Sequence, residues 1–170
     1  MRKAQFYLVF VVLTIVQMLI CNYFHLSAYL MLSILPVMVL CLPIRIPPVG
    51  AMAVAFVTGL LVDLFSEGLL GINALALVPV AFARNGILRM IFGGELFARN
   101  EDFSVSKNGF GKVAVAILIA QAIFLAVYVW ADSAGTRPAW FNALRFGASL
   151  AAGFAVSLLV VEPLAPDTRK

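Results

Sequence analysis

Two carboxylates interrupt the apolar sequence "GLLVDLFSEGLLGINALAL", which runs from Gly59 to Leu77. Asp63 and Glu67 separate two hydrophobic stretches, so they belong either to a charged site within a membrane or to a polar turn. Ser66 lies between them, but no histidine or lysine in this stretch could act as its base, so a serine nucleophile is not indicated. We expect Glu67 to be solvated, whereas placing Asp63 outside the membrane would shorten an already short apolar segment.

The other reactive residue types do not form a recognisable site. The only histidine, His25, has no nearby residues that could complete a metal site, so we expect it to be a polar surface residue. Cys21 and Cys41 lack CxxC spacing, and we expect them at opposite faces of a membrane, too far apart for a disulfide. No phosphate-binding glycine loop or pair of catalytic carboxylates stands out. We therefore expect no enzyme activity, no metal and no cofactor.

The composition indicates that these residues are positioned by membrane helices. Hydrophobic residues make up 64% of the 170 residues and charged residues only 12%, and the mean hydropathy is +1.05. Soluble domains are about 45–50% apolar and about 25% charged. The net charge of +4 has no long basic run behind it, so we do not expect nucleic-acid binding. The chain is expected to form a single domain in lipid.

Six apolar segments approach the length of about 20 residues that spans a bilayer. Pro36 interrupts the second and Pro79 lies inside the fourth. The stretch from Gly93 to Lys112 is the only long polar connection, and it is too short to be a domain. The sequence therefore predicts an all-α membrane protein with spans at residues 4–23, 26–42, 49–65, 69–88, 113–131 and 140–161.

The basic residues predict which way the helices run. Lys and Arg collect in the cytoplasmic loops of membrane proteins. With a cytoplasmic N-terminus, only Arg137 falls outside, and Arg145 lies within the last span. We therefore expect a multi-pass membrane protein with both termini in the cytoplasm. The residues expected on the cytoplasmic side are Arg2, Lys3, Arg45, Arg84, Arg89, Arg99, Lys107, Lys112, Arg169 and Lys170.

The last span carries a ridge of small residues and one arginine. Gly147, Ala151 and Ala155 recur at every fourth position, which suits close helix packing. The ridge could serve a partner, but we favour packing within the protein's own bundle. Arg145 either snorkels towards the outer surface or pairs with a charge in the bundle. Asp63 is expected at a similar depth, so we predict an Asp63–Arg145 ion pair; the alternative is that Asp63 caps the following helix.

The stretch around Asp63 also resembles a known signature. The pattern G-L-L-x-D-L-x-S-x-x-x-L-G-x-N-A-L resembles the signature region of the rod shape-determining protein MreD family. That family often has His at the position of Asn73. Chain length, the six expected spans and the basic loop after the fourth span agree with the family. The matching residues are Gly59, Leu60, Leu61, Asp63, Leu64, Ser66, Leu70, Gly71, Asn73, Ala74 and Leu75.

The resemblance implies a non-enzymatic scaffold of the bacterial cell-elongation complex. Such proteins bind MreC, a single-span protein with a periplasmic coiled coil, and help link the MreB cytoskeleton to the peptidoglycan glycosyltransferase and transpeptidase. The resemblance also implies a fold similar to the substrate-binding S component of energy-coupling-factor transporters. A vitamin-binding transporter subunit is therefore the alternative function. The short external loops favour the scaffold, and the sequence leaves open whether the chain forms homo-oligomers.

Overall fold

The computed structural model describes residues 3–23, 30–65, 70–93, 109–134 and 136–164. Within these ranges every regular element is a helix. Five of these helices are long and apolar enough to cross a membrane. The elements are α1 (Lys3–Tyr23), α2 (Leu35–Leu40), α3 (Pro48–Phe65), α4 (Ile72–Phe92), α7 (Phe110–Ser133) and α8 (Ala139–Leu164).

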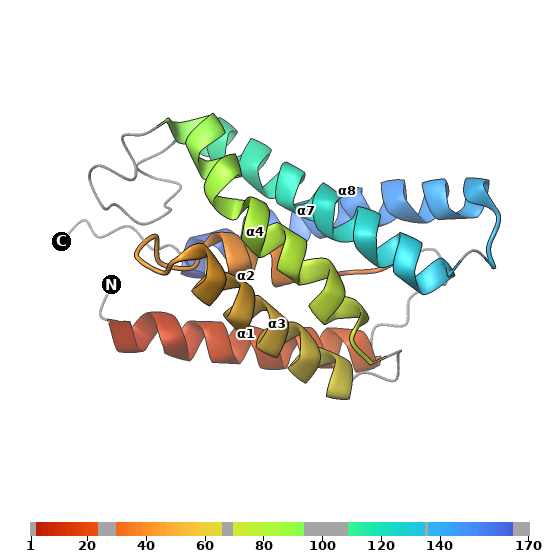
Figure 1. The fold of residues 1–170 in the computed structure, drawn as a ribbon, viewed down its shortest axis with the longest axis horizontal. Helices are drawn as coiled ribbons and strands as arrows, with labels where there is room; N and C mark the ends of the chain where they lie inside the picture. Colours follow the sequence, from red (N-terminus) through yellow and green to blue (C-terminus); the bar gives the residue numbers. More distant parts are fainter. Residues whose placement is uncertain (1–2, 24–29, 66–69, 94–108, 135, 165–170) are drawn as a thin grey trace.

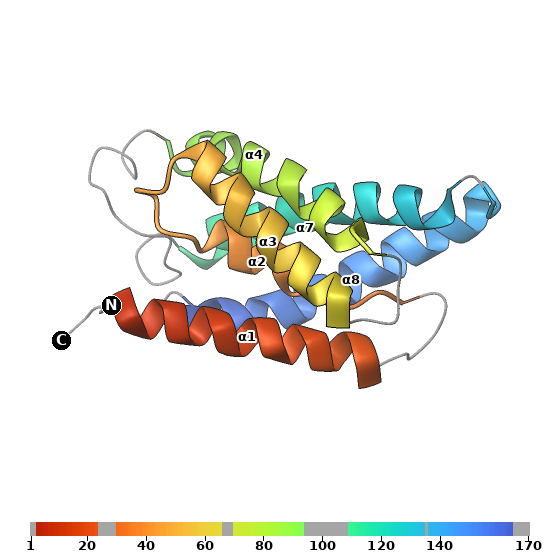
Figure 2. The same ribbon diagram turned by 60° about the horizontal axis from the view of Figure 1, so that its bottom comes forward.

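The long helices form an elongated bundle. Consecutive helices α3, α4, α7 and α8 pack as antiparallel neighbours, and α1 lies along α3 and α8 (Figures 1 and 2). Helix α1 begins and helix α8 ends at the same end of the bundle. The turn between α7 and α8 extends beyond the turn between α3 and α4 at the opposite end (Figure 1). An all-helical fold compatible with a multi-pass membrane protein is therefore confirmed.

The second apolar segment differs from the expected continuous span over residues 26–42. Residues 30–34 are not helical, and α2 has only six residues, all of them buried. Pro36 disfavours a longer helix, because its ring would clash with the carbonyl of Leu32, four residues earlier. The proline alone does not determine the break, since α4 continues through Pro79. The short helix instead starts at Leu35, where a proline in the first turn is tolerated. Helix α2 contacts all five long helices and forms the centre of the core.

Side chains from the surrounding helices replace the missing helical hydrogen bonds of residues 31–34. Gln17 of α1 donates from Nε2 to the Leu32 carbonyl at 3.2 Å and accepts the Ile34 N–H at 2.8 Å. Gln121 of α7 donates to the Ser33 carbonyl at 3.2 Å. Ser149 of α8 accepts the Met31 N–H at 2.8 Å. Non-helical backbone at membrane depth is tolerated only where protein satisfies its polar groups, and these three residues meet that condition.

Arg84 does the same for the other end of α2. Its side chain is fully buried in the middle of α4, so it is not the cytoplasmic loop residue that the sequence predicted. The guanidinium donates from Nε to the Leu40 carbonyl at 3.3 Å and from Nη2 to the Leu42 carbonyl. The last carbonyls of a helix have no partners within the helix itself. Arg84 therefore caps α2 from a neighbouring helix.

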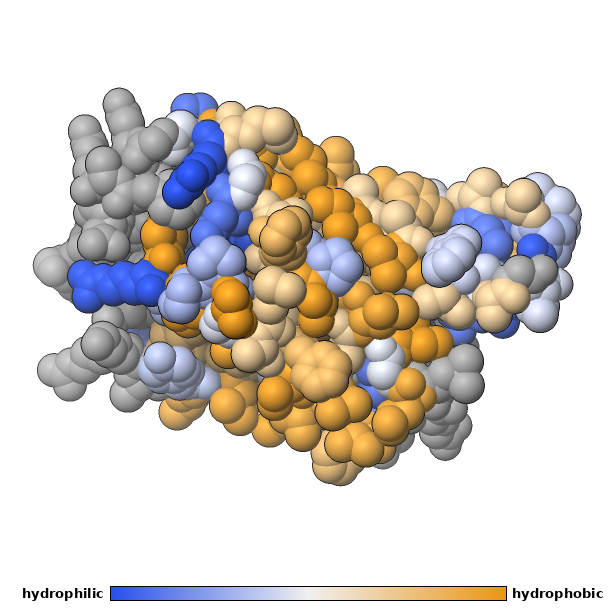
Figure 3. Space-filling view, in the orientation of Figure 1, coloured by the Kyte–Doolittle hydropathy of each residue, from blue (hydrophilic) through white to orange (hydrophobic). Residues whose placement is uncertain are grey.

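The surface has the distribution of polarity that a bilayer requires. On the face that Figure 3 shows, apolar side chains cover most of the middle of the bundle, and hydrophilic ones gather towards its two ends. Exposed basic residues occur in the connection after α2, in the last turn of α4 and in the first turn of α7, which all lie at the end where α1 begins (Figure 1). These residues are Arg45, Arg89 and Lys112.

We predict that Gln17→Leu destabilises the protein more than Gln5→Leu does. The first change leaves the buried Leu32 carbonyl and Ile34 N–H without partners, and we expect a loss of about 1–2 kcal/mol. Gln5 lies exposed on the same helix and serves as the matched control. The midpoint of thermal unfolding in detergent micelles measures both effects. Equal midpoints for the two variants would show that Gln17 does not support the broken segment.

Candidate functional site

Asp63 is the centre of the hairpin between α3 and α4. Its side chain projects from the last turn of α3, and the residue is only 4% exposed. The carboxylate accepts the backbone N–H groups of Gly71 at 3.0 Å, Asn73 at 3.2 Å and Ala74 at 3.2 Å. It also accepts Nδ2 of the Asn73 side chain at 2.8 Å. Asp63 therefore caps the N-terminus of α4 from the end of α3.

A carboxylate at this position suits the N-terminus of α4. The first N–H groups of a helix have no partners within the helix and carry a partial positive charge. Asp63 supplies a negative charge there and satisfies three of these backbone groups. The expected Asp63–Arg145 ion pair is therefore wrong, and the alternative that Asp63 caps the following helix is confirmed.

Gly59 and Gly71 allow the cap to form. Gly59 lies one helical turn before Asp63 on the same face of α3, and a Cβ there would lie 2.5 Å from the Ala74 Cα and 2.6 Å from the Ala74 nitrogen. Real side chains do not approach backbone atoms so closely, so only glycine lets the two helices meet here. Gly71, the residue before α4, has a φ of 94°, which L-residues with a side chain rarely adopt.

Four of the five predicted motif residues thus come together in one structural unit. Gly59, Asp63, Gly71 and Asn73 form the hairpin cap, and Ser66 lies outside the described residues, as do Glu67 and His25. The arrangement can rigidly fix the turn between two membrane helices. The Oδ1 atom of Asn73 is buried and has no hydrogen-bond partner, so the amide keeps an unused acceptor.

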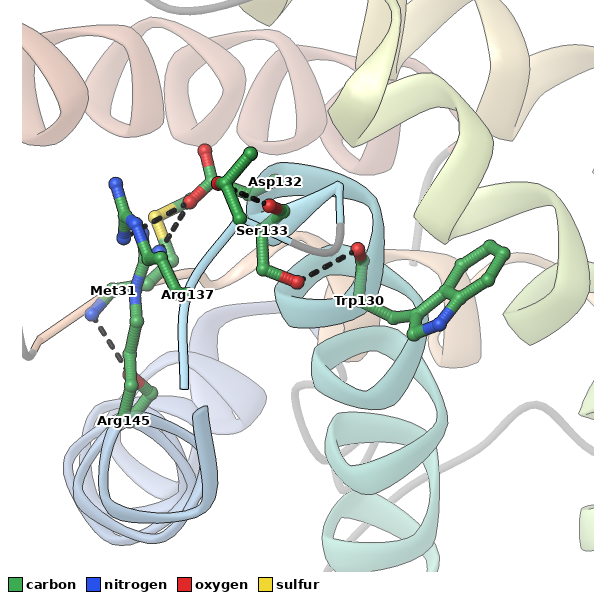
Figure 4. Close-up of polar contacts among 8 residues, drawn as sticks. Met31, Trp130, Asp132, Ser133, Arg137 and Arg145 are labelled. Atoms are coloured by element: carbon green, nitrogen blue, oxygen red, sulfur yellow. Dashed lines mark hydrogen bonds and ion pairs between the residues drawn. The ribbon is translucent and has the colours of Figure 1, made fainter. Parts of the chain in front are cut away.

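Arg145 pairs with a residue that the sequence analysis did not consider. Its Nη1 contacts Oδ2 of Asp132, near the end of α7, and Arg137 approaches the same oxygen at 3.4 Å (Figure 4). The aromatic ring of Tyr128 lies 5.9 Å from the Arg145 guanidinium carbon. Helices α7 and α8 form a hairpin, so an acidic residue near the end of α7 and a basic residue near the start of α8 could have indicated this contact.

The ridge of small residues faces away from the bundle. Gly147, Ala151 and Ala155 are all exposed, so packing inside the protein's own bundle is wrong. The face that packs inward lies on a different side of α8. It contains Arg145, Ser149, Gly153, Ser157 and Val161. A Cβ at Gly153 would lie 2.2 Å from Nε2 of Gln121, so a larger residue there would displace the Gln121 side chain. The recurrence of polar and small residues at every fourth position of the sequence could have indicated this buried face.

Within the described residues no group of three metal-ligating side chains occurs, and both cysteines are free thiols. No protein-family model, no curated protein and no solved structure matches the chain.

We predict that Gly59→Ala weakens the fold, whereas Gly86→Ala does not. The new methyl group at position 59 would collide with the backbone of α4, at a cost of about 1–3 kcal/mol. A methyl group at position 86 meets no atom within 4 Å, and Ala is the better helix former, so stability should be unchanged or higher. Thermal unfolding of both purified variants tests this. A stable Gly59→Ala protein would contradict the close approach of α3 and α4.

We predict that charges can be exchanged between Asp132 and Arg145 but not between Asp63 and Arg145. Asp63→Arg removes the helix cap, and a second change at Arg145 cannot restore it. Asp132→Arg combined with Arg145→Asp keeps opposite charges in contact and should recover much of the stability that each single change loses. Folded yield and thermal midpoints of the three single and two double variants measure this. Rescue of Asp63→Arg by Arg145→Asp would contradict the observed pairing.

Proposed function

We propose that the chain is a non-enzymatic membrane subunit of the bacterial cell-elongation complex, with a role like that of the MreD family. The observation that carries the proposal is the convergence of Gly59, Asp63, Gly71 and Asn73 in one cap. Each of these positions has a separate physical requirement. Gly59 allows the close approach of the helices, Asp63 caps α4, Gly71 adopts a positive φ, and Asn73 donates its side-chain amide to Asp63. The motif residues thus form one structural unit, which supports the resemblance.

The surface supports an orientation with both ends of the chain in the cytoplasm. The exposed Arg45, Arg89 and Lys112 belong to the end of the bundle where α1 begins and α8 ends. Positive residues prefer the cytoplasmic side. The chain then crosses the inner membrane six times, and its second crossing uses the non-helical residues before α2 and α2 itself. The α3–α4 and α7–α8 turns then face the periplasm.

This orientation suits a scaffold that binds a periplasmic partner. The cap joins the last turn of α3 to the first turn of α4, so these two helix ends keep one arrangement and little entropy is lost when they contact a partner. An MreC-like protein with one membrane span and a periplasmic coiled coil is the proposed partner. Through it the chain would help couple the MreB cytoskeleton to the glycosyltransferase and transpeptidase that build peptidoglycan. The exposed apolar sides of the bundle contact membrane lipid.

We predict that depletion of the protein makes a rod-shaped bacterial host round and wide while division continues. Microscopy of a strain with repressible expression measures this, and re-expression of the wild-type chain should restore the rods. Asp63→Ala should restore them poorly, whereas Glu67→Ala, a carboxylate of the same stretch that we expect to be solvated, should restore them fully.

Two results would contradict the proposal. Depleted cells that keep their rod shape but need a vitamin supplement would indicate the transporter S component instead. Failure of an MreC-like coiled-coil protein from the same host to co-purify with the detergent-solubilised chain would remove the proposed partner.

A further inference from the structure

The turn between α7 and α8 carries an uncompensated positive charge. Asp132 is the one carboxylate in contact with both Arg137 and Arg145. A single carboxylate neutralises one guanidinium, so the three side chains together retain a charge of about +1. The first turn of α8 contains no acidic residue. The positive dipole end of α8 and the negative dipole end of α7 meet at this turn and offset each other, so the residual charge comes from the side chains. The cluster therefore attracts an anion.

Arg137 is the member of the cluster that remains accessible. Its side chain is 40% exposed, compared with 11% for Arg145 and 20% for Asp132. Its guanidinium carbon lies 5.3 Å from the centre of the Phe141 ring, which holds it at the start of α8. Arg145 lies almost completely buried beneath it, and its Nε has no hydrogen-bond partner. The exposed Arg137 guanidinium thus lies over the buried Arg145 guanidinium, whose hydrogen-bond donors are not all paired.

Two exposed tryptophans place this cluster at the depth of lipid headgroups. Trp130 in the last turn of α7 is 79% exposed, and Trp140 in the first turn of α8 is 65% exposed. Tryptophan prefers the boundary between hydrocarbon and headgroups. Arg137 and Asp132 lie between these two residues in the sequence and near the same turn (Figure 4). An anion that reaches the cluster from the membrane is therefore a lipid headgroup.

We propose that the Arg137–Asp132–Arg145 cluster binds the phosphate headgroup of an anionic phospholipid. Arg137 donates to a phosphate oxygen, since guanidinium groups match the geometry of phosphates. The acyl chains lie against the apolar surface next to the two tryptophans. Asp132 neutralises one of the two arginines, and the remaining positive charge favours a net negative lipid over a zwitterionic one. This inference does not depend on the role in cell elongation.

Native mass spectrometry of the full chain in detergent tests the site with dioleoyl phosphatidylglycerol as the probe. We expect the wild type to retain the lipid and Arg137→Gln to bind it about fivefold more weakly, the ratio that one basic residue contributes near an anionic surface. Arg45→Gln removes an exposed arginine at the opposite end of the bundle and is the matched control. Asp132→Asn, which removes the only neutralising charge, should bind the lipid more tightly. Thermal unfolding checks that all variants are folded.

Three outcomes would overturn the proposal. Equal losses for Arg137→Gln and Arg45→Gln would mean that the lipid adheres through charge in general. Equal retention of dioleoyl phosphatidylcholine would remove the requirement for a net negative lipid. Complete displacement of the lipid by glycerol 3-phosphate at equal concentration would show that the cluster recognises a soluble phosphate and that the acyl chains contribute nothing.

Discussion

The fold depends on satisfying the backbone of an apolar segment that is not a continuous helix. Residues 30–34 are not helical, and each unpaired N–H or C=O in hydrocarbon would cost several kcal/mol. Gln17, Gln121, Ser149 and Arg84 supply the missing partners from four different helices. The short helix α2 is consequently the point at which those helices are fixed relative to one another. Replacing these four residues by apolar ones would remove the hydrogen bonds that fix the surrounding helices relative to α2.

The Asp63 cap likewise satisfies backbone groups that would otherwise lack hydrogen-bond partners. The first N–H groups of α4 lie in a buried position, and the carboxylate from α3 satisfies them. Gly59 brings the two helices close enough for this contact. Asp132 gives Arg145 its partner in the neighbouring hairpin. In each case a polar side chain from one helix completes the bonding of the next, so the polar residues of this apolar chain serve mainly to join elements.

The sequence alone predicts the long helices and the motif better than the contacts between them. Length and hydropathy predict a span at residues 49–65, and the structure has helix α3 at Pro48–Phe65. The convergence of Gly59, Asp63, Gly71 and Asn73 also follows from their positions around one turn. The pairing of Arg145 was mispredicted because depth and opposite charge do not determine which helices are neighbours. Gly147, Ala151 and Ala155 were misplaced because small residues suit both a packed and a lipid-facing surface, and only the rotation of α8 decides between them.

The support of residues 31–34 also sets an order of events during synthesis. Met31 is bonded to Ser149, which the ribosome adds 118 residues later. Gln121 likewise follows Ser33 by 88 residues. When residues 31–34 have been synthesised, Gln17 is the one residue among Gln17, Gln121 and Ser149 that is already present to bond their backbone groups. The hydrogen bonds of Met31 and Ser33 can therefore form only after α7 and α8 have been synthesised. Maturation of this protein is thus timed by its C-terminal half.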